Sequence, residues 1–184
     1  MLQRLLGRLV ARPKADLAPV LLYQATVAQA RNPAFFGEFG FPDTVLGRLD
    51  VLHLHMFLLA RRLGVRRDEA LAMLSQHVFD RHVEALDTAL RQLGVGDISV
   101  PKRKKRMVRE FYGLIAALDR PFENPDVETV ADAVGQRFHG GTRPDVAHAL
   151  ARYLVSAAKA LSAESDEAFL AGAVSWPAPA AGIK

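Results

Sequence analysis

The chain has 184 residues, half of them apolar, no cysteine, and a formal net charge of +4 at neutral pH. This length and apolar content are typical of one folded domain and exclude a disordered chain, while the lack of cysteine excludes disulfides and thiolate metal sites. Six of the 24 cations lie at 102–109, which leaves 18 cations to face 20 anions, and such a basic patch on an acidic body predicts an anionic partner.

The first expected element is a basic, amphipathic segment over residues 1–15. Leucines share one side of it, and Arg4, Arg8 and Arg12 recur every four residues. As a helix it would suit the surface of an anionic membrane, although a frayed and solvated terminus is the simpler interpretation. The uncharged stretch 17–30 is shorter than the roughly 20 residues of a membrane-spanning helix. We expect neither a spanning helix nor a secretory signal.

Helical periodicity dominates the remainder, and we find no alternating strand pattern. Asp43 and Asp68 are expected N-caps, and Gly94 is expected to end a helix. Helices are expected over 16–31, 44–63, 68–93, 101–118, 126–138 and 144–162, with a short turn near 166–171. The sequence therefore predicts an all-α fold, a single-domain irregular bundle of about six to seven helices. It spans 16–171, and a flexible Ala/Pro-rich tail follows at 172–184.

Two apolar features are candidate contacts for a partner. The loop 32–43 carries four phenylalanines, among them Phe36 and Phe39; we favour a loop folded onto the core, the alternative being a surface that clasps another helix. The helix 44–63 is apolar almost all round, because Leu54 and Leu58 lie opposite its main stripe. Such a helix is either central in the fold or covered by a partner.

The segment 101–118 combines an apolar face with a cationic stripe on the opposite face. Its cations recur at the i, i+3, i+4 and i+7 spacing of one helix face, and they are Lys102, Lys105, Arg106 and Arg109. Tyr112 borders the stripe, and Gly113 lies on the same exposed side, where a missing side chain permits close approach.

Local helix stability does not explain these cations, because positive charge in the first turn opposes the helix dipole. Either an acidic stripe of the preceding helix, formed by Asp80, Glu84 and Asp87, neutralises them within the fold, or an outside partner binds them. We take binding as the hypothesis. A nucleic-acid backbone is one such partner.

Catalytic and metal-binding motifs are not found. His53 and His55 point about 200° apart on a helix, and the H-E-x-x-H pattern, the nucleophile elbow and the phosphate-binding loop are missing. His82 lies amid an apolar face and is expected to be a hydrogen-bonded core histidine. The sequence thus predicts a protein that is not an enzyme, with no catalytic residue, cofactor, metal or small-molecule substrate.

Two stretches carry further information: FGFPDTVLGRLDVLHLHMFLLARRL at 39–63 and LRQLGVGDISVPKRKKRMVREFYG at 90–113. The first resembles the G-x-P-D-T-x-x-G-R segment and Leu-His helix of the ubiquinol–cytochrome c chaperone family, and the second resembles its L-R-x-x-G-V-G-D and V-P-K … F-Y-G signature. The matching positions of the first are Pro42, Asp43, Thr44, Gly47, Arg48 and His55. Those of the second are Gly94, Gly96, Asp97, Pro101, Lys102, Phe111, Tyr112 and Gly113.

The resemblance implies an all-helical, non-enzymatic assembly chaperone that binds newly synthesised cytochrome b and assists the biogenesis of respiratory complex III, the cytochrome bc1 complex. Mitochondrial members work with a small helical partner beside the ribosomal exit tunnel. The chain looks similar to bacterial members, which implies a cytoplasmic protein with peripheral contact at the inner membrane. The alternative is a ribosome- or RNA-binding helical module that uses the basic helix 101–118.

The candidate partner-binding residues follow from both lines of reasoning. Asp97 is expected to hold Arg48 or the start of the basic helix, and the cationic stripe with Tyr112 is expected to contact the client or ribosomal RNA. The full set is Lys102, Lys105, Arg106, Arg109, Tyr112, Gly113, Phe36, Phe39, Leu54 and Leu58.

Overall fold

The computed structural model describes residues 14–65 and 68–179. The expected basic segment 1–15 therefore lies outside the described residues, apart from its last two, which begin the first described helix. The last five residues of the expected tail, 180–184, also lie outside.

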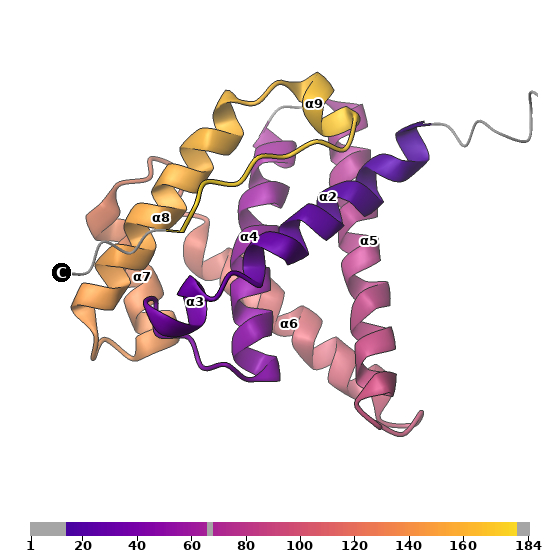
Figure 1. Cartoon of the computed structure of the whole chain (residues 1–184), viewed down its shortest axis with the longest axis horizontal. Helices are drawn as coiled ribbons and strands as arrows, with labels where there is room; N and C mark the ends of the chain where they lie inside the picture. The colour runs from indigo at the N-terminus through magenta and orange to yellow at the C-terminus, as the bar shows by residue number, and fades with distance from the viewer. Residues whose placement is uncertain (1–13, 66–67, 180–184) are drawn as a thin grey trace, which may run out of the picture.

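Within these ranges the chain is all-helical, with eight helices and no strand (Figure 1). The helices are α2 (Lys14–Ala30), α3 (Ala34–Gly37), α4 (Val45–Val65), α5 (Glu69–Gln92), α6 (Val100–Leu118), α7 (Val127–His139), α8 (Pro144–Ala163) and α9 (Asp166–Leu170). The predicted all-α class is confirmed, and so is each predicted helix. None of the described helices has both the length and the apolar character needed to cross a bilayer.

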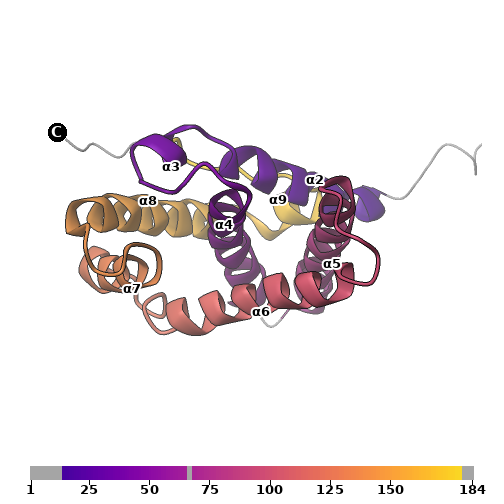
Figure 2. The same ribbon diagram turned by 90° about the horizontal axis from the view of Figure 1, so that it is seen from below.

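α4 is the central helix of the bundle. It contacts α2, α5, α6 and α8, and Figure 2 shows it between α2 on one side and α6 on the other. α7 and α8 pack closely against each other, with Gly135 facing Ala147: a Cβ added at Gly135 would come within 3.1 Å of the Ala147 Cβ. The central position explains why α4 is apolar almost all round, since it has neighbours on every side.

The turn that precedes α4 accounts for the P-D-T-x-x-G-R motif. Thr44 Oγ1 accepts a hydrogen bond from Gly47 N at 3.2 Å, so Thr44 is the N-cap where Asp43 was expected. Asp43 instead accepts a hydrogen bond from Arg48 Nε at 2.6 Å. A Cβ added at Gly47 would lie 2.0 Å from the carbonyl oxygen of Pro42. The glycine is therefore required by a close backbone approach.

Gly47→Ala is expected to lower the free energy of unfolding by about 1–3 kcal/mol, as overpacking usually does, because the obstructing atom is backbone and cannot rotate away. The matched control is Gly113→Ala on α6, where the added Cβ meets only the Arg137 guanidinium at 4.0 Å. The control should keep or slightly gain stability through better helix propensity. Urea unfolding of both variants tests this, and equal changes would contradict it.

The described part of the expected tail, 172–179, lies against the core instead of being free. The Trp176 ring meets the His55 ring at a centroid distance of 5.0 Å, and Gln29 Nε2 donates to the Pro177 carbonyl at 2.8 Å. Ser175 N donates to Glu164 Oε1 at 2.9 Å. The segment crosses between α8 and α2 in Figure 1. One aromatic ring and a few hydrogen bonds outweigh the Ala/Pro-rich composition that suggested flexibility.

Candidate functional site

The outer face of α6 forms a cationic ridge, which we define as Lys102, Arg103, Lys105, Arg106 and Arg109. All five are exposed, and no side chain among them pairs with another described residue. Figure 2 shows α6 along the outside of the bundle. Tyr112 is 56% exposed, and Gly113 is exposed next to it. The structure thus brings together the six candidates predicted on this helix and adds Arg103.

Among the cations of α6, the acidic stripe of α5 pairs only with Lys104, which is not part of the ridge. Lys104 Nζ donates to Asp87 Oδ1 at 2.7 Å, and hydrogen bonds from Lys104 and Arg91 lower the pKa of Asp87. Asp80 and Glu84 bind Gln76 and Arg81 on their own helix. The internal explanation for the ridge cations therefore fails within the described residues.

The role that the sequence predicted for Asp97 is wrong. Asp97 pairs with Arg91 at the end of α5, so it holds neither Arg48 nor the start of the basic helix. The pair links the end of α5 to the turn that leads into the ridge.

Three of the four apolar candidates lie in the core. Phe39 is 0% exposed, Leu54 is 1% and Leu58 is 2%, so a partner cannot reach them on this surface. The loop 32–43 folds inward, and the Phe39 ring packs 5.9 Å from that of Tyr153 on α8. Phe36 alone remains partly exposed, with the Arg48 guanidinium 4.8 Å from its ring centroid.

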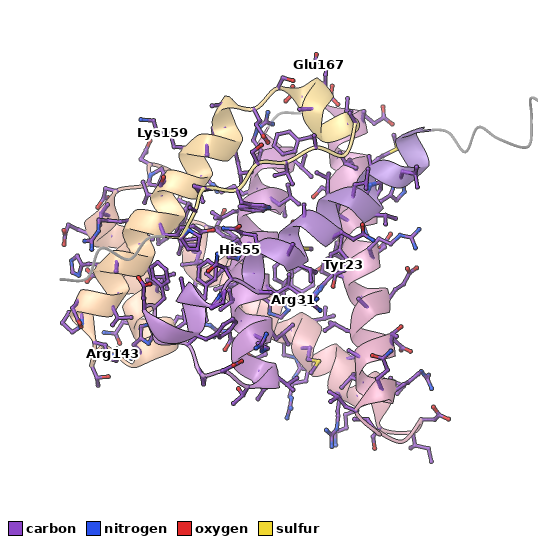
Figure 3. All side chains as sticks on the ribbon, viewed as in Figure 1. Tyr23, Arg31, His55, Arg143, Lys159 and Glu167 are labelled. Carbon is purple, nitrogen blue, oxygen red and sulfur yellow. The ribbon has the colours of Figure 1, made fainter. Side chains whose placement is uncertain are left out.

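An apolar groove that the sequence did not predict lies between α2, α4 and α5. Its volume is about 500 Å³. Two residues of its lining, Tyr23 and Arg31, are labelled in Figure 3, where they lie between α4 and α5. Arg48 and Gln92 are the other polar members of the lining. The rest is apolar: Val27 and Ala30 of α2, Val45, Leu49 and Leu52 of α4, Ala85, Leu86, Ala89 and Leu90 of α5, Leu93 at its C-cap, and Met107 of α6.

Exposed apolar side chains gather at one end of the groove. Val45 is 53% exposed and Leu93 is 57% exposed, and both line the groove. Leu46, at 56%, and Ile98, at 97%, follow in the adjacent turns. Four of the nine large apolar side chains that are exposed in the described ranges thus lie at the start of α4, at the C-cap of α5 and in the turn that follows it. Such clustering is typical of an interaction site.

A larger hollow of about 770 Å³ lies between α2, α5 and α9. Its lining includes the charged side chains of Asp80, Arg81 and Glu84. It therefore fits an apolar segment less well than the groove does.

Two buried histidines, His53 and His82, lie next to Tyr23 of the groove lining. His82 Nδ1 lies 3.5 Å from the Tyr23 hydroxyl, and His82 Nε2 lies 3.1 Å from His53 Nε2. Burial lowers the pKa of His53 to about 3 and that of His82 to about 4, so both rings are neutral and share one N–H between them. His82 is thus the hydrogen-bonded core histidine that was expected, and it positions Tyr23. The described residues contain no group of three or more His, Cys, Asp or Glu that could hold a metal ion.

The family model described as ubiquinol–cytochrome C chaperone matches residues 37–176, three quarters of the chain. The chain belongs to the ubiquinol–cytochrome c chaperone family. The crystal structure of the Cbp3 homolog from Brucella abortus is similar, with 32% sequence identity, a TM-score of 0.79 and 97% of each chain covered. No curated protein matches the chain. Membership of the ubiquinol–cytochrome c chaperone family confirms the resemblance and supports a role in complex III assembly.

Proposed function

We propose that this protein is a non-enzymatic assembly chaperone that holds an apolar helix of newly synthesised cytochrome b in the groove between α2, α4 and α5. Family membership supports the assembly role. The observation that carries the client site is an open, mostly aliphatic groove with exposed apolar side chains at one end.

The size and chemistry of the groove suit one face of a helix. A helix with its side chains is about 10–12 Å wide, so a groove of about 500 Å³ accepts anchoring side chains from one face and leaves the other face free. Anchors at i, i+4 and i+7 are the usual mode of this kind of recognition. Arg31 at the lining provides positive charge for polar groups that flank an apolar segment.

The proposal assigns holding, and no bond making, to this protein. The histidines with the most strongly lowered pKa values, His53, His55 and His82, are buried in the core. Within the groove, burial raises the pKa of Tyr23, which keeps its hydroxyl protonated and able to donate a hydrogen bond.

Filling the groove tests the client site. Ala89 is exposed and lines the groove, so Ala89→Trp should fold normally and occupy the space that a client side chain needs. We expect at least about tenfold weaker binding, because one buried apolar side chain contributes about 1.5–3 kcal/mol. A photo-crosslinking residue at position 89 should capture newly synthesised cytochrome b, and the tryptophan variant should lower complex III while the cytochrome b transcript persists.

The matched control is Ala117→Trp, an exposed alanine on α6 that does not line the groove. It should leave complex III unchanged, and a crosslinker there should not capture the client. Normal complex III with a filled groove, or equal capture from both positions, would rule out the groove as the client site.

A further inference from the structure

The turn between α5 and α6 displays an isoleucine to solvent at the end of the cationic ridge. Ile98 is 97% exposed, the highest value among the exposed large apolar side chains of the described ranges. The turn is well fixed: Gly94 has φ +75°, Gly94 N donates to the Arg91 carbonyl, and Val95 N donates to the Leu90 carbonyl. This is the Schellman arrangement of a helix C-terminus. Ser99 N and Val100 N then donate to the Gly96 carbonyl, at 2.8 and 3.2 Å, so the backbone on both sides of the exposed Ile98 is hydrogen-bonded.

Positive charge begins directly after this tip. Lys102 and Arg103 stand in the first turn of α6, and the other ridge cations follow on the next two turns. α6 carries Glu110 as its single anion, and that carboxylate pairs with Arg137 at 3.2 Å. The ridge charge thus lacks compensation from its own helix.

We propose that Leu93, Ile98 and the cationic ridge dock this protein onto an anionic phospholipid surface. The cations would bind headgroup phosphates, each lysine or arginine near such a surface adding to the attraction. Leu93 and Ile98 enter the boundary between headgroups and acyl chains, as apolar residues of interfacial segments do. Anionic headgroups at the start of α6 also compensate the unfavourable position of cations at a helix N-terminus.

The apolar tip favours lipid over RNA as the anionic partner. A phosphate backbone would bind the cations, but it has no apolar layer in which the Ile98 side chain could be buried. Single-stranded RNA is usually held by stacking on several aromatic side chains, whereas among the described residues Tyr112 is the one exposed aromatic beside the ridge. A bilayer surface satisfies the charge and the apolar tip together.

Docking in this way would bring one end of the groove close to the bilayer. Leu93 belongs both to the tip and to the groove lining, and Val45 lines the groove at the start of α4. The start of α4 and the α5–α6 turn lie at the same end of the molecule in Figure 1. This inference does not depend on the proposed client, because Leu93, Ile98 and the cationic ridge would bind the lipid surface whether or not a client is present.

The test uses the full chain with vesicles of phosphatidylcholine alone or mixed with phosphatidylglycerol. Because the chain has no cysteine, Ile98→Cys accepts a single NBD fluorophore. We expect a blue shift and quenching by a membrane-embedded quencher with the anionic vesicles only. The matched control is Leu170→Cys on α9, which is 40% exposed and should show neither change.

Lys105→Glu with Arg109→Glu should weaken vesicle binding at least about 25-fold, since each cation is worth about fivefold. Lys159→Glu on α8 with Arg143→Glu at its N-cap, the same charge change away from the ridge, should have a much smaller effect. A probe at position 98 that stays in water, or equal losses from both double variants, would overturn the proposal. Tighter binding of an RNA oligonucleotide than of anionic vesicles at the same salt would overturn it in favour of nucleic acid.

Discussion

Arg62→Met is expected to lower the free energy of unfolding by about 3 kcal/mol, the low end of the cost of removing one partner from a buried ion pair, because the Asp166 side chain is 25% exposed. Arg62 of α4 is 7% exposed. Its guanidinium donates to the carbonyl oxygens of Leu161 and Glu164 and to the Asp166 carboxylate, at 2.7–2.9 Å. It also lies 4.7 Å from the Phe169 ring centroid. Methionine fills the space but leaves the end of α8 without these donors.

The neighbouring arginine provides the control for this variant. Arg61 pairs with Asp119, whose side chain is 65% exposed, and donates to the Phe122 carbonyl. Because surface pairs contribute about 0–1 kcal/mol, Arg61→Met should cost much less than Arg62→Met. Guanidinium unfolding at neutral pH measures both, and similar losses would show that burial of the Arg62 network does not stabilise the fold.

The helices could be predicted from sequence because each long one carries its own periodic apolar face. The expected helix 68–93 is observed as Glu69–Gln92 with Asp68 as its N-cap. α3 was missed because it has only four residues and no side-chain cap. The N-cap of α4 was placed one residue early, since Asp43 and Thr44 are both good caps and only the turn geometry decides between them.

The binding surfaces could be predicted only in part. The ridge was found because charges along one face of a helix with an apolar opposite face must point outward. Leu54 and Leu58 were misplaced because a helix that is apolar all round looks the same whether its neighbours belong to the fold or to a partner. The groove was missed for a similar reason: Leu90, which is 3% exposed, and Leu93, which is 57% exposed, both line it and share one apolar stripe, so the pattern alone does not separate buried from open positions.

Three buried histidines make the fold sensitive to acid. Burial lowers the pKa of His55 from 6.5 to about 4, that of His82 to about 4 and that of His53 to about 3. Both ring nitrogens of His55 already have a hydrogen-bond partner. With Nδ1 donating to the Val51 carbonyl, Nε2 accepts the hydroxyl proton of Tyr153 at 2.7 Å and cannot bind a second proton without losing that bond. That hydroxyl in turn accepts from Gln29. Protonation of His55 would leave the Tyr153 hydroxyl proton without an acceptor.

The free energy of unfolding should therefore fall by about 4–5 kcal/mol between about pH 7.5 and pH 5. Over this range the three histidines become protonated in the unfolded chain but stay neutral in the folded chain. Each of the three histidines contributes about 2 kcal/mol to this loss at the lower pH. Asp50 opposes it by about 1 kcal/mol, since burial raises its pKa to about 6 and the folded carboxyl binds a proton first. Urea unfolding across this range measures the slope.

Replacing His55 and Tyr153 together by phenylalanine isolates one of these histidines. Removing both partners of a buried hydrogen bond is nearly neutral when shape is kept, and Gln29 Nε2, which loses Tyr153 as an acceptor, keeps its bond to the Pro177 carbonyl. The double variant should therefore stay folded at neutral pH. Its acid-induced loss should be smaller by about 2 kcal/mol, the share of one histidine. His148→Gln is the control, because His148 is exposed and its hydrogen bond to Glu128 raises its pKa, so its removal should not reduce the acid-induced loss. An unchanged slope in the double variant would show that the core accepts a proton at His55 without penalty.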